Sequence, residues 1–179
     1  MTMSPGSGDT PIEASAMTPT SEAAPSNPHV YAVKFLCGVL NEEGPVEPGN
    51  YATAINVHNP NRHPVAILKK AILLFSSTQT EPEREKPTPP ARPIEVDLRP
   101  DWAFEIDCPD IREVLLAGPP GPPTPSFIKG WVVIDSPSGA PLDVVAVYTV
   151  RGVEETGQPG PVSIAIDRAP GTQVLASQG

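Results

Sequence analysis

Proline is the feature that most limits what this chain can fold into. The sequence has 26 prolines in 179 residues, and a proline in a helix interior costs about 3 kcal/mol. A protein built from long helices is therefore excluded. Charged residues make up 18% of the chain and hydrophobic residues 39%, whereas a disordered chain carries more charge and fewer Val, Ile and Leu residues. The composition favours a compact all-β domain with proline-rich loops.

Apolar residues recur along the chain with the period of two that is typical of strands, not with the period of a helix. The segments with this pattern are 31–37, 51–58, 94–99, 102–108 and 162–166. Segment 65–75 is a long, mostly apolar run that we expect to form one strand with a bend, and 127–134 and 142–150 are denser strands rich in β-branched residues. Turn-forming residues separate them, and the stretch 136–141 predicts a hairpin between two of them. We therefore expect an immunoglobulin-like β-sandwich of about seven or eight strands. A tight β-barrel is the alternative.

One short helix is expected after the fifth strand. Residues 108–110 read Cys-Pro-Asp, which places a proline at the first helical position and an acid beside the helix N-terminus. Three apolar residues follow at helical spacing: Ile111, Val114 and Leu115. Gly118 and the prolines after it end the helix. The two proline-rich loops, 80–93 and 118–125, are expected to be stiff and extended.

The chain divides into three parts by composition. Residues 1–29 contain no Lys or Arg and are rich in Pro, Ser and Thr, so we predict a disordered acidic arm. Residues 30–168 form the predicted β-sandwich domain. Residues 169–179 are small and uncharged after the last strand, and we predict a flexible C-terminal tail.

The charge balance argues against several classes of partner. The chain has 12 Lys and Arg residues and 21 Asp and Glu residues, so its net charge is −9. This opposes binding to the phosphates of nucleic acids or of anionic membranes. The longest apolar run, 65–75, is interrupted by Lys69 and Lys70, so no membrane insertion is expected. Without a signal-like N-terminus we expect a cytoplasmic protein, with unconventional export left open.

The two cysteines each end a predicted strand on its apolar side. Cys37 and Cys108 are either two independent buried thiols or a pair that faces across the sandwich and forms a disulfide. A third reading makes Cys108 a nucleophile at the helix N-terminus. No histidine lies next to it in the sequence to support that role.

No constellation points to catalysis or to a bound cofactor. His58 and His63 flank a turn but have no third ligand beside them, so no metal site is expected. The nucleophile elbow, the phosphate-binding glycine loop and the EF-hand pattern are absent from the sequence. We therefore predict that the protein is not an enzyme and needs no cofactor. Trp102 and Trp131, if both are exposed on one sheet face, would form an aromatic platform for a small ligand.

Several segments together resemble a known kind of protein. These segments are KFLCG (34–38), YATAINVHNP (51–60), FEIDCPDI (104–111), FIKGWVVIDS (127–136) and LDVVAVYTV (142–150). In this order they resemble a family of uncharacterised bacterial β-sandwich proteins, over about residues 30–150. The resemblance implies the sandwich fold and a bacterial source but no activity. At the level of the fold alone, the chain is similar to the small soluble transducer of bacterial sensory rhodopsin, an oligomeric β-sandwich.

The sequence predicts a non-enzymatic structural or protein-interaction module. Leu142–Val150 carries apolar residues on both faces, so the face away from the core needs a cover. We expect the chain to associate through its sheet faces or edges. The partner would be a second copy, in a homo-oligomer, or another protein. A small-ligand or carbohydrate-binding module is the alternative.

Overall fold

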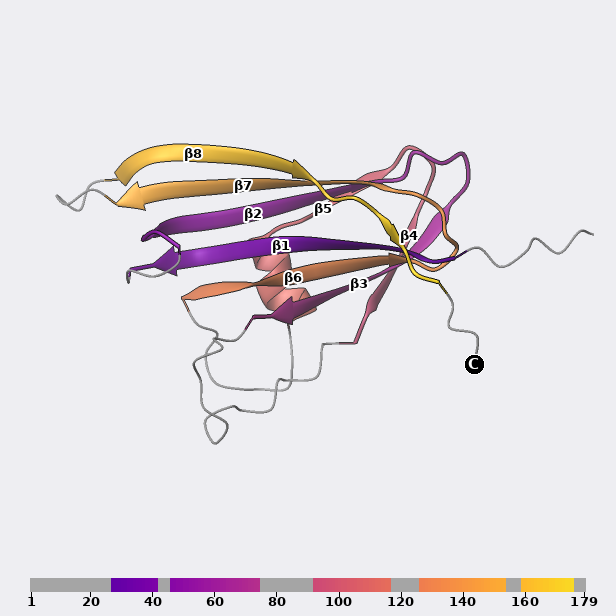
Figure 1. The fold of residues 1–179 in the computed structure, drawn as a ribbon, viewed down its shortest axis with the longest axis horizontal. Coiled ribbons are helices and arrows are strands. Elements are labelled where there is room, and N and C mark those ends of the chain that lie inside the picture. The colour runs from indigo at the N-terminus through magenta and orange to yellow at the C-terminus, as the bar shows by residue number, and fades with distance from the viewer. Residues whose placement is uncertain (1–26, 42–45, 75–91, 117–125, 154–158, 176–179) are drawn as a thin grey trace, which may run out of the picture.

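The computed structural model describes residues 27–41, 46–74, 92–116, 126–153 and 159–175. The predicted arm lies outside these ranges up to residue 26. Residues 80–91 of the 80–93 loop and the whole of the 118–125 loop lie outside them as well. Over the described residues the chain is mostly strand (Figure 1), and the predicted all-β class is confirmed.

Every predicted strand is present, and the described residues contain one more. The strands are β1 (His29–Leu40), β2 (Gly49–His58), β3 (Val65–Leu73), β4 (Ile94–Leu98), β5 (Ala103–Ile106), β6 (Phe127–Ser136), β7 (Asp143–Val153), β8 (Pro159–Arg168) and β9 (Thr172–Gln173). The additional strand, β9, pairs with the start of β1. It lies within the segment for which the sequence predicted a flexible tail.

The strands form one continuous antiparallel sheet in the order β4-β3-β6-β1-β2-β7-β8. Its first half is β4-β3-β6-β1, and its second half is β2-β7-β8 with β5 on the other edge of β2. The joint between the halves is short, because β1 and β2 pair only between Gly38–Leu40 and Gly49–Tyr51. Beyond it the halves diverge and enclose the core, which gives a sandwich-like fold. The halves are thus joined in one sheet, unlike the two separate sheets of an immunoglobulin domain.

The core fills the space between the two halves. In β1 the odd-numbered residues from Tyr31 to Cys37 are buried and in β6 the even-numbered ones, as expected for strands that are covered on one side. The largest fully buried apolar side chains are Phe35, Ile55, Ile67, Ile106, Ile111, Leu115 and Ile134. Gly130 makes room for Phe35, since a Cβ atom there would lie 2.7 Å from the Phe35 ring.

The predicted helix begins where the sequence indicated. It consists of α1 (Cys108–Asp110) and a π-helical turn, η1 (Ile111–Leu115). The Asp107 carboxylate caps α1 by accepting a hydrogen bond of 2.9 Å from the Asp110 N–H. Ile111 and Leu115 are buried, whereas Val114 is exposed. The helix is therefore a short plug over one end of the core.

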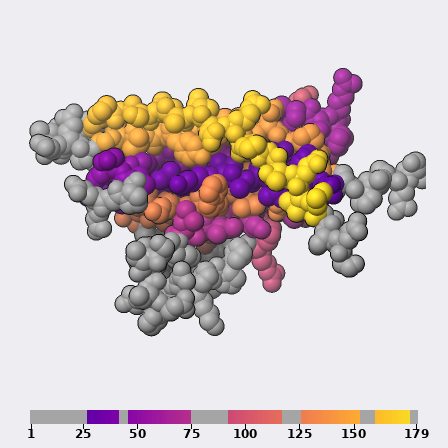
Figure 2. Space-filling model, in the orientation of Figure 1, coloured from indigo at the N-terminus to yellow at the C-terminus, as the bar shows by residue number. Residues whose placement is uncertain are grey.

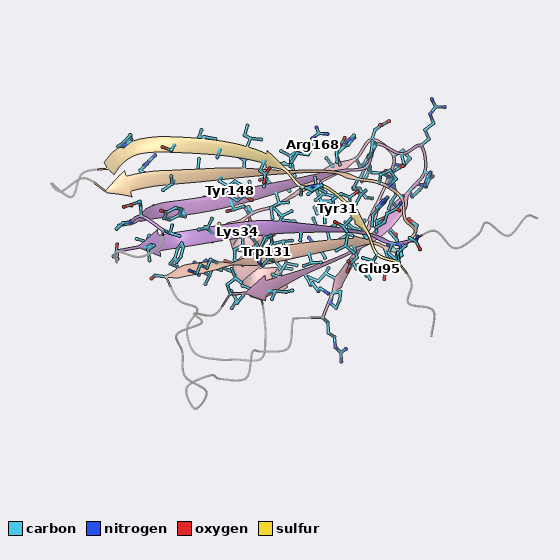
Figure 3. All side chains as sticks on the ribbon, in the orientation of Figure 1. Tyr31, Lys34, Glu95, Trp131, Tyr148 and Arg168 are labelled. Atoms are coloured by element: carbon cyan, nitrogen blue, oxygen red, sulfur yellow. A yellow bond between two sulfur atoms is a disulfide. The ribbon has the colours of Figure 1, made fainter. Side chains whose placement is uncertain are left out.

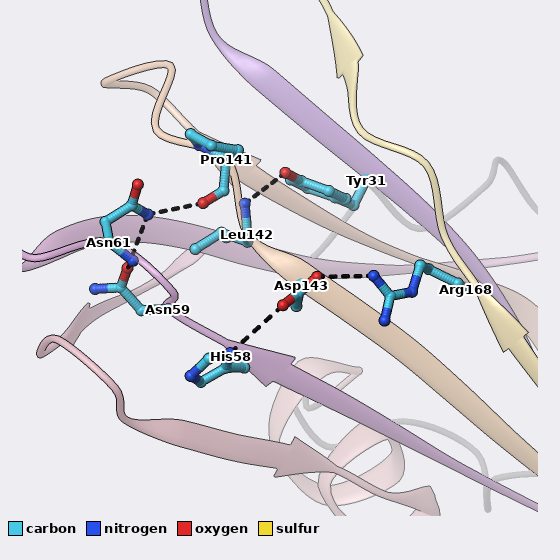
Figure 4. A network of polar contacts seen from close by, with 8 residues as sticks. All are labelled: Tyr31, His58, Asn59, Asn61, Pro141, Leu142, Asp143 and Arg168. Carbon is cyan, nitrogen blue, oxygen red and sulfur yellow. Dashed lines mark hydrogen bonds and ion pairs between the residues drawn. The ribbon is translucent and has the colours of Figure 1, made fainter.

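A buried asparagine holds three chain connections together at the other end of the sandwich. The Asn59 side chain is fully buried and donates hydrogen bonds to the carbonyls of Leu98 (2.9 Å) and His63 (3.0 Å). Its Oδ1 accepts from the Asn61 N–H, and Asn61 Nδ2 in turn donates to the Pro141 carbonyl (Figure 4). These bonds satisfy a buried polar group and fix the β2–β3, β4–β5 and β6–β7 connections against one another.

The first testable prediction concerns Gly38 at the joint. Its φ is +106°, and an added Cβ atom would lie 1.8 Å from the Ser126 carbonyl oxygen. We expect Gly38→Ala to lower the free energy of unfolding by about 2 kcal/mol or more, because both backbone strain and this clash oppose it. Urea denaturation measures the change. Gly152→Ala is the matched control, since no atom lies within 4 Å of its Cβ position. Equal losses in both variants would contradict the explanation.

Candidate interaction surface

The joint between the two halves ends at a threonine. If the register of the Gly38–Tyr51 pair continued along the strands, Leu36 would pair with Thr53. Instead of a main-chain pair, the Thr53 hydroxyl accepts from the Leu36 N–H (3.1 Å) and donates to the Leu36 carbonyl (3.0 Å). The N–H of Thr53 points to Cys108 Sγ at 3.3 Å. A side chain therefore closes the ladder, and the strands separate here.

The two cysteines meet beside this joint. Cys37 and Cys108 form a disulfide with an S–S distance of 2.06 Å, across 71 residues of sequence. Arg112 Nη2 donates to the Cys37 carbonyl (2.8 Å) and to the Ser126 carbonyl (3.0 Å). Of the alternatives that the sequence left open, the structure shows the disulfide, so neither cysteine is a free thiol. Structural disulfides persist mainly in oxidising compartments, and the cytoplasmic location stays a prediction.

The two tryptophans lie in different parts of the fold. Trp131 is on β6, on the side away from the core, between Lys34 of β1 and Ile72 of β3. Trp102 is in the turn between β4 and β5, with the Arg99 guanidinium 4.8 Å from its ring centroid. Both rings are exposed. The structure does not bring them onto one platform.

The second half of the sheet has an apolar outer side. On β7, Val147 and Thr149 face away from the core, and their partners on β8 are Ile166 and Ile164. The exposed fractions are 50% for Val162, 65% for Ile164 and 71% for Ile166. Figure 2 shows β8 as an outermost strand, in yellow. A row of apolar side chains on an edge strand is unusual for a surface that meets only water.

The hydrogen-bonding groups of β8 follow a definite alternation. The Ala169 N–H donates to the Val144 carbonyl at 3.0 Å. Because alternate residues of an antiparallel strand face a given neighbour, the main-chain groups of Val162, Ile164 and Ile166 point away from β7. Among the described residues β8 pairs with β7 alone. Its outer edge therefore presents unpaired donors and acceptors beside the apolar row. The sequence predicted this strand but not its exposure.

A cleft of about 370 Å³, lined by both polar and apolar residues, lies at the end where β8 leaves the sheet. Asp143 lies between His58 Nδ1 (3.6 Å) and Arg168 (3.1 Å), as Figure 4 shows. The buried Tyr31 hydroxyl accepts a hydrogen bond of 2.7 Å from the Leu142 N–H. Both ion pairs are exposed to solvent, so they contribute at most about 1 kcal/mol each.

A smaller hollow of about 160 Å³ lies between β1 and the β7–β8 pair. Its lining residues include Leu36, Tyr51, Tyr148, Val150 and Ala165. The Tyr148 hydroxyl donates to the Lys34 carbonyl at 3.0 Å. Burial, and to a lesser extent the charge of Asp167, raise the pKa of Tyr148 above its usual value. The tyrosine is therefore neutral at physiological pH and fixes one wall of an apolar hollow.

Within the described ranges no three His, Cys, Asp or Glu side chains are grouped closely enough to hold a metal ion. In the same ranges no helix has the length and apolar character needed to cross a membrane.

Comparisons with known proteins leave the chain without an assigned family. No family model matches it, and no curated protein matches it. A solved structure from Thermotoga maritima, titled "Crystal Structure of Thermotoga maritima 1070", is similar at 10% identity with a TM-score of 0.37. The match covers 81% of this chain and 93% of that one. The resemblance to the bacterial β-sandwich family and to the rhodopsin transducer stays a prediction.

The second testable prediction concerns the disulfide. Replacing both Cys37 and Cys108 by alanine removes a covalent link between distant parts of the chain, so we expect the free energy of unfolding to fall by about 2–4 kcal/mol. Adding a reductant to the unaltered protein should cause a similar loss in urea denaturation. The double variant is the control, because reductant should leave its stability unchanged. An unaltered protein that unfolds identically with and without reductant would contradict the prediction.

Proposed function

We propose that the protein is a non-enzymatic structural or protein-interaction module that associates with itself through β8. The observation that supports the proposal is the exposed edge of this strand, which carries Val162, Ile164 and Ile166. Proteins usually protect edge strands with lysine, bulges or covering segments. Beyond the register shift near its start, β8 instead shows apolar side chains and free main-chain groups along one edge from Val162 to Ile166.

A second copy of the chain is the partner whose edge fits this one best. If two β8 strands pair antiparallel about an axis through Ile164, Val162 of one copy lies opposite Ile166 of the other. All three residues direct main-chain groups outward, so hydrogen bonds and the apolar row align in the same register. Pro161, which has no N–H, lies outside this central stretch, beside the register shift near the start of β8.

Pairing would join the two sheets into one and bring the apolar stripes of the two copies side by side. Each cross-strand pair of apolar side chains contributes about 0.2–1 kcal/mol, and the stripe would include three such side chains from each copy. The edge carries few charges, with Asp167 and Arg168 only at its end. No like charges would meet at the centre of the pair.

The third testable prediction is the loss of the dimer in Ile164→Asp. We expect the full chain to be a dimer in size-exclusion chromatography with light scattering, and the variant to associate about a hundredfold more weakly or not at all. Two carboxylates would face each other across the axis in an apolar surrounding. Val174→Asp is the matched control, because Val174 is an exposed valine away from β8. If the unaltered chain is a monomer, the proposal is wrong.

The fourth testable prediction checks the register. Ile164→Cys places a thiol opposite its own copy, at a Cα–Cα distance of about 5.5 Å, whereas Ser163→Cys lies opposite residue 165 of the other chain. Both native cysteines are already bonded to each other, so the new thiol is the reactive one. We expect a short bis-maleimide to link Ile164→Cys more rapidly than Ser163→Cys. Equal rates would contradict this register. A dimer formed in another register would still be detected by light scattering.

The carbohydrate-binding alternative has less support than self-association. It needs aromatic rings that lie side by side, and Trp102 and Trp131 are on different parts of the molecule.

A further inference from the structure

A cationic and apolar surface lies on the first half of the sheet, on the side away from the core. Pairing across the strands places Lys34 beside Trp131, and Trp131 beside Ile72. The next row of outward-facing residues in one direction along the strands contains Lys70 of β3. The next row in the other direction contains Lys129 of β6 and Leu36 of β1. We name this surface, made of Lys34, Leu36, Lys70, Ile72, Lys129 and Trp131, the lysine–tryptophan face.

The charge of this face is opposite to that of the protein. The chain has a net charge of −9 and 12 Lys and Arg residues in all, yet three lysines surround one indole here. Within the described residues, no ion pair involves Lys34, Lys70 or Lys129. Lys69, by contrast, is on the opposite side of β3 and packs 5.0 Å from the centroid of the Phe104 ring. The three ammonium groups are therefore available to an external anionic group.

The small apolar hollow adjoins this face. Leu36 belongs to both, and the hydrogen bond from Tyr148 to the Lys34 carbonyl holds the hollow against β1. In Figure 3, Tyr148, Lys34 and Trp131 follow one another down the sheet. The hollow has a volume of about 160 Å³ and an apolar lining. A cavity of about this size accepts a benzene-sized group.

We propose that the lysine–tryptophan face binds an acidic segment of a partner protein and that the hollow receives one apolar side chain of that segment. Charge complementarity identifies the segment as acidic, because the lysines attract carboxylates. Trp131 and Ile72 are 37% and 40% exposed, and tryptophan contributes strongly to binding when a partner covers it. The proposal adds a partner surface to the self-association proposed above and does not depend on it.

A protein segment fits this face better than a membrane or a nucleic acid does. On the same side of the sheet the next row contains Asp135 and Glu95, which flank Leu68. A flat anionic bilayer would press against these carboxylates, whereas an extended segment can cross the lysines without reaching them. The net charge of −9 also repels long polyanions.

The fifth testable prediction uses the full chain and a synthetic probe. The probe is a fluorescein-labelled peptide of alternating glutamate and serine with one central leucine, and binding is measured by fluorescence anisotropy. We expect saturable binding that weakens with added salt. The double variant Lys34→Gln and Lys129→Gln should bind about two- to fivefold more weakly for each lysine removed. Lys69→Gln, with the same charge change on the opposite side, should leave the affinity unchanged.

A second peptide, with serine in place of the central leucine, tests the hollow. We expect it to bind the unaltered protein more weakly than the leucine peptide, and Ala165→Leu, which fills the hollow, to abolish that difference. Circular dichroism of each variant checks that the fold is kept. The proposal is overturned if the lysine variants bind like the unaltered protein, if Lys69→Gln weakens binding equally, or if both peptides bind alike. Equally tight binding of duplex DNA or phosphatidylserine vesicles would also overturn it.

Discussion

The short joint between β1 and β2 is the constraint on which the rest of the architecture depends. The two strands share three residue pairs, and then the Thr53 hydroxyl takes both main-chain groups of Leu36. A hydroxyl can accept and donate at once, so no polar group of Leu36 is left unpaired where the ladder ends. This allows the strands to separate at that point without the cost of buried, unsatisfied main-chain groups.

The separation has consequences on both sides of the joint. The edge of β2 that β1 leaves becomes free for β5, and β5 leads directly into α1, which carries Cys108 back to Cys37. On the other side Tyr148 of β7 donates to the Lys34 carbonyl of β1, and the hollow lies between β1 and the β7–β8 pair. The disulfide and the hollow thus both lie where the two halves separate.

Sequence patterns could predict the local structure but not these long-range features. Alternating apolar residues identify strands such as β1 and β2 because burial on one side imposes the period of two. Dense runs of β-branched residues identify β6 and β7, and Cys-Pro-Asp marks the helix start. β9 has only two residues and leaves no pattern. Alternation also shows which residues of β8 share a side, but not whether another layer covers that side. The grouping of Lys34, Lys70 and Lys129 depends on the register between β1, β6 and β3, which is set by tertiary pairing.

The lysine–tryptophan face and the β8 edge lie on different halves of the sheet, although the hollow beside that face is lined in part by β8. Pairing through β8 uses the outer edge of the second half, whereas the lysine–tryptophan face is on β1, β6 and β3. A dimer formed through β8 therefore keeps both copies of that face accessible. A partner with two acidic segments would bind the second one as an intramolecular event, so modest affinity at each face would yield much tighter overall attachment when the spacing permits. Self-association would then strengthen partner binding without any new contact within the lysine–tryptophan face.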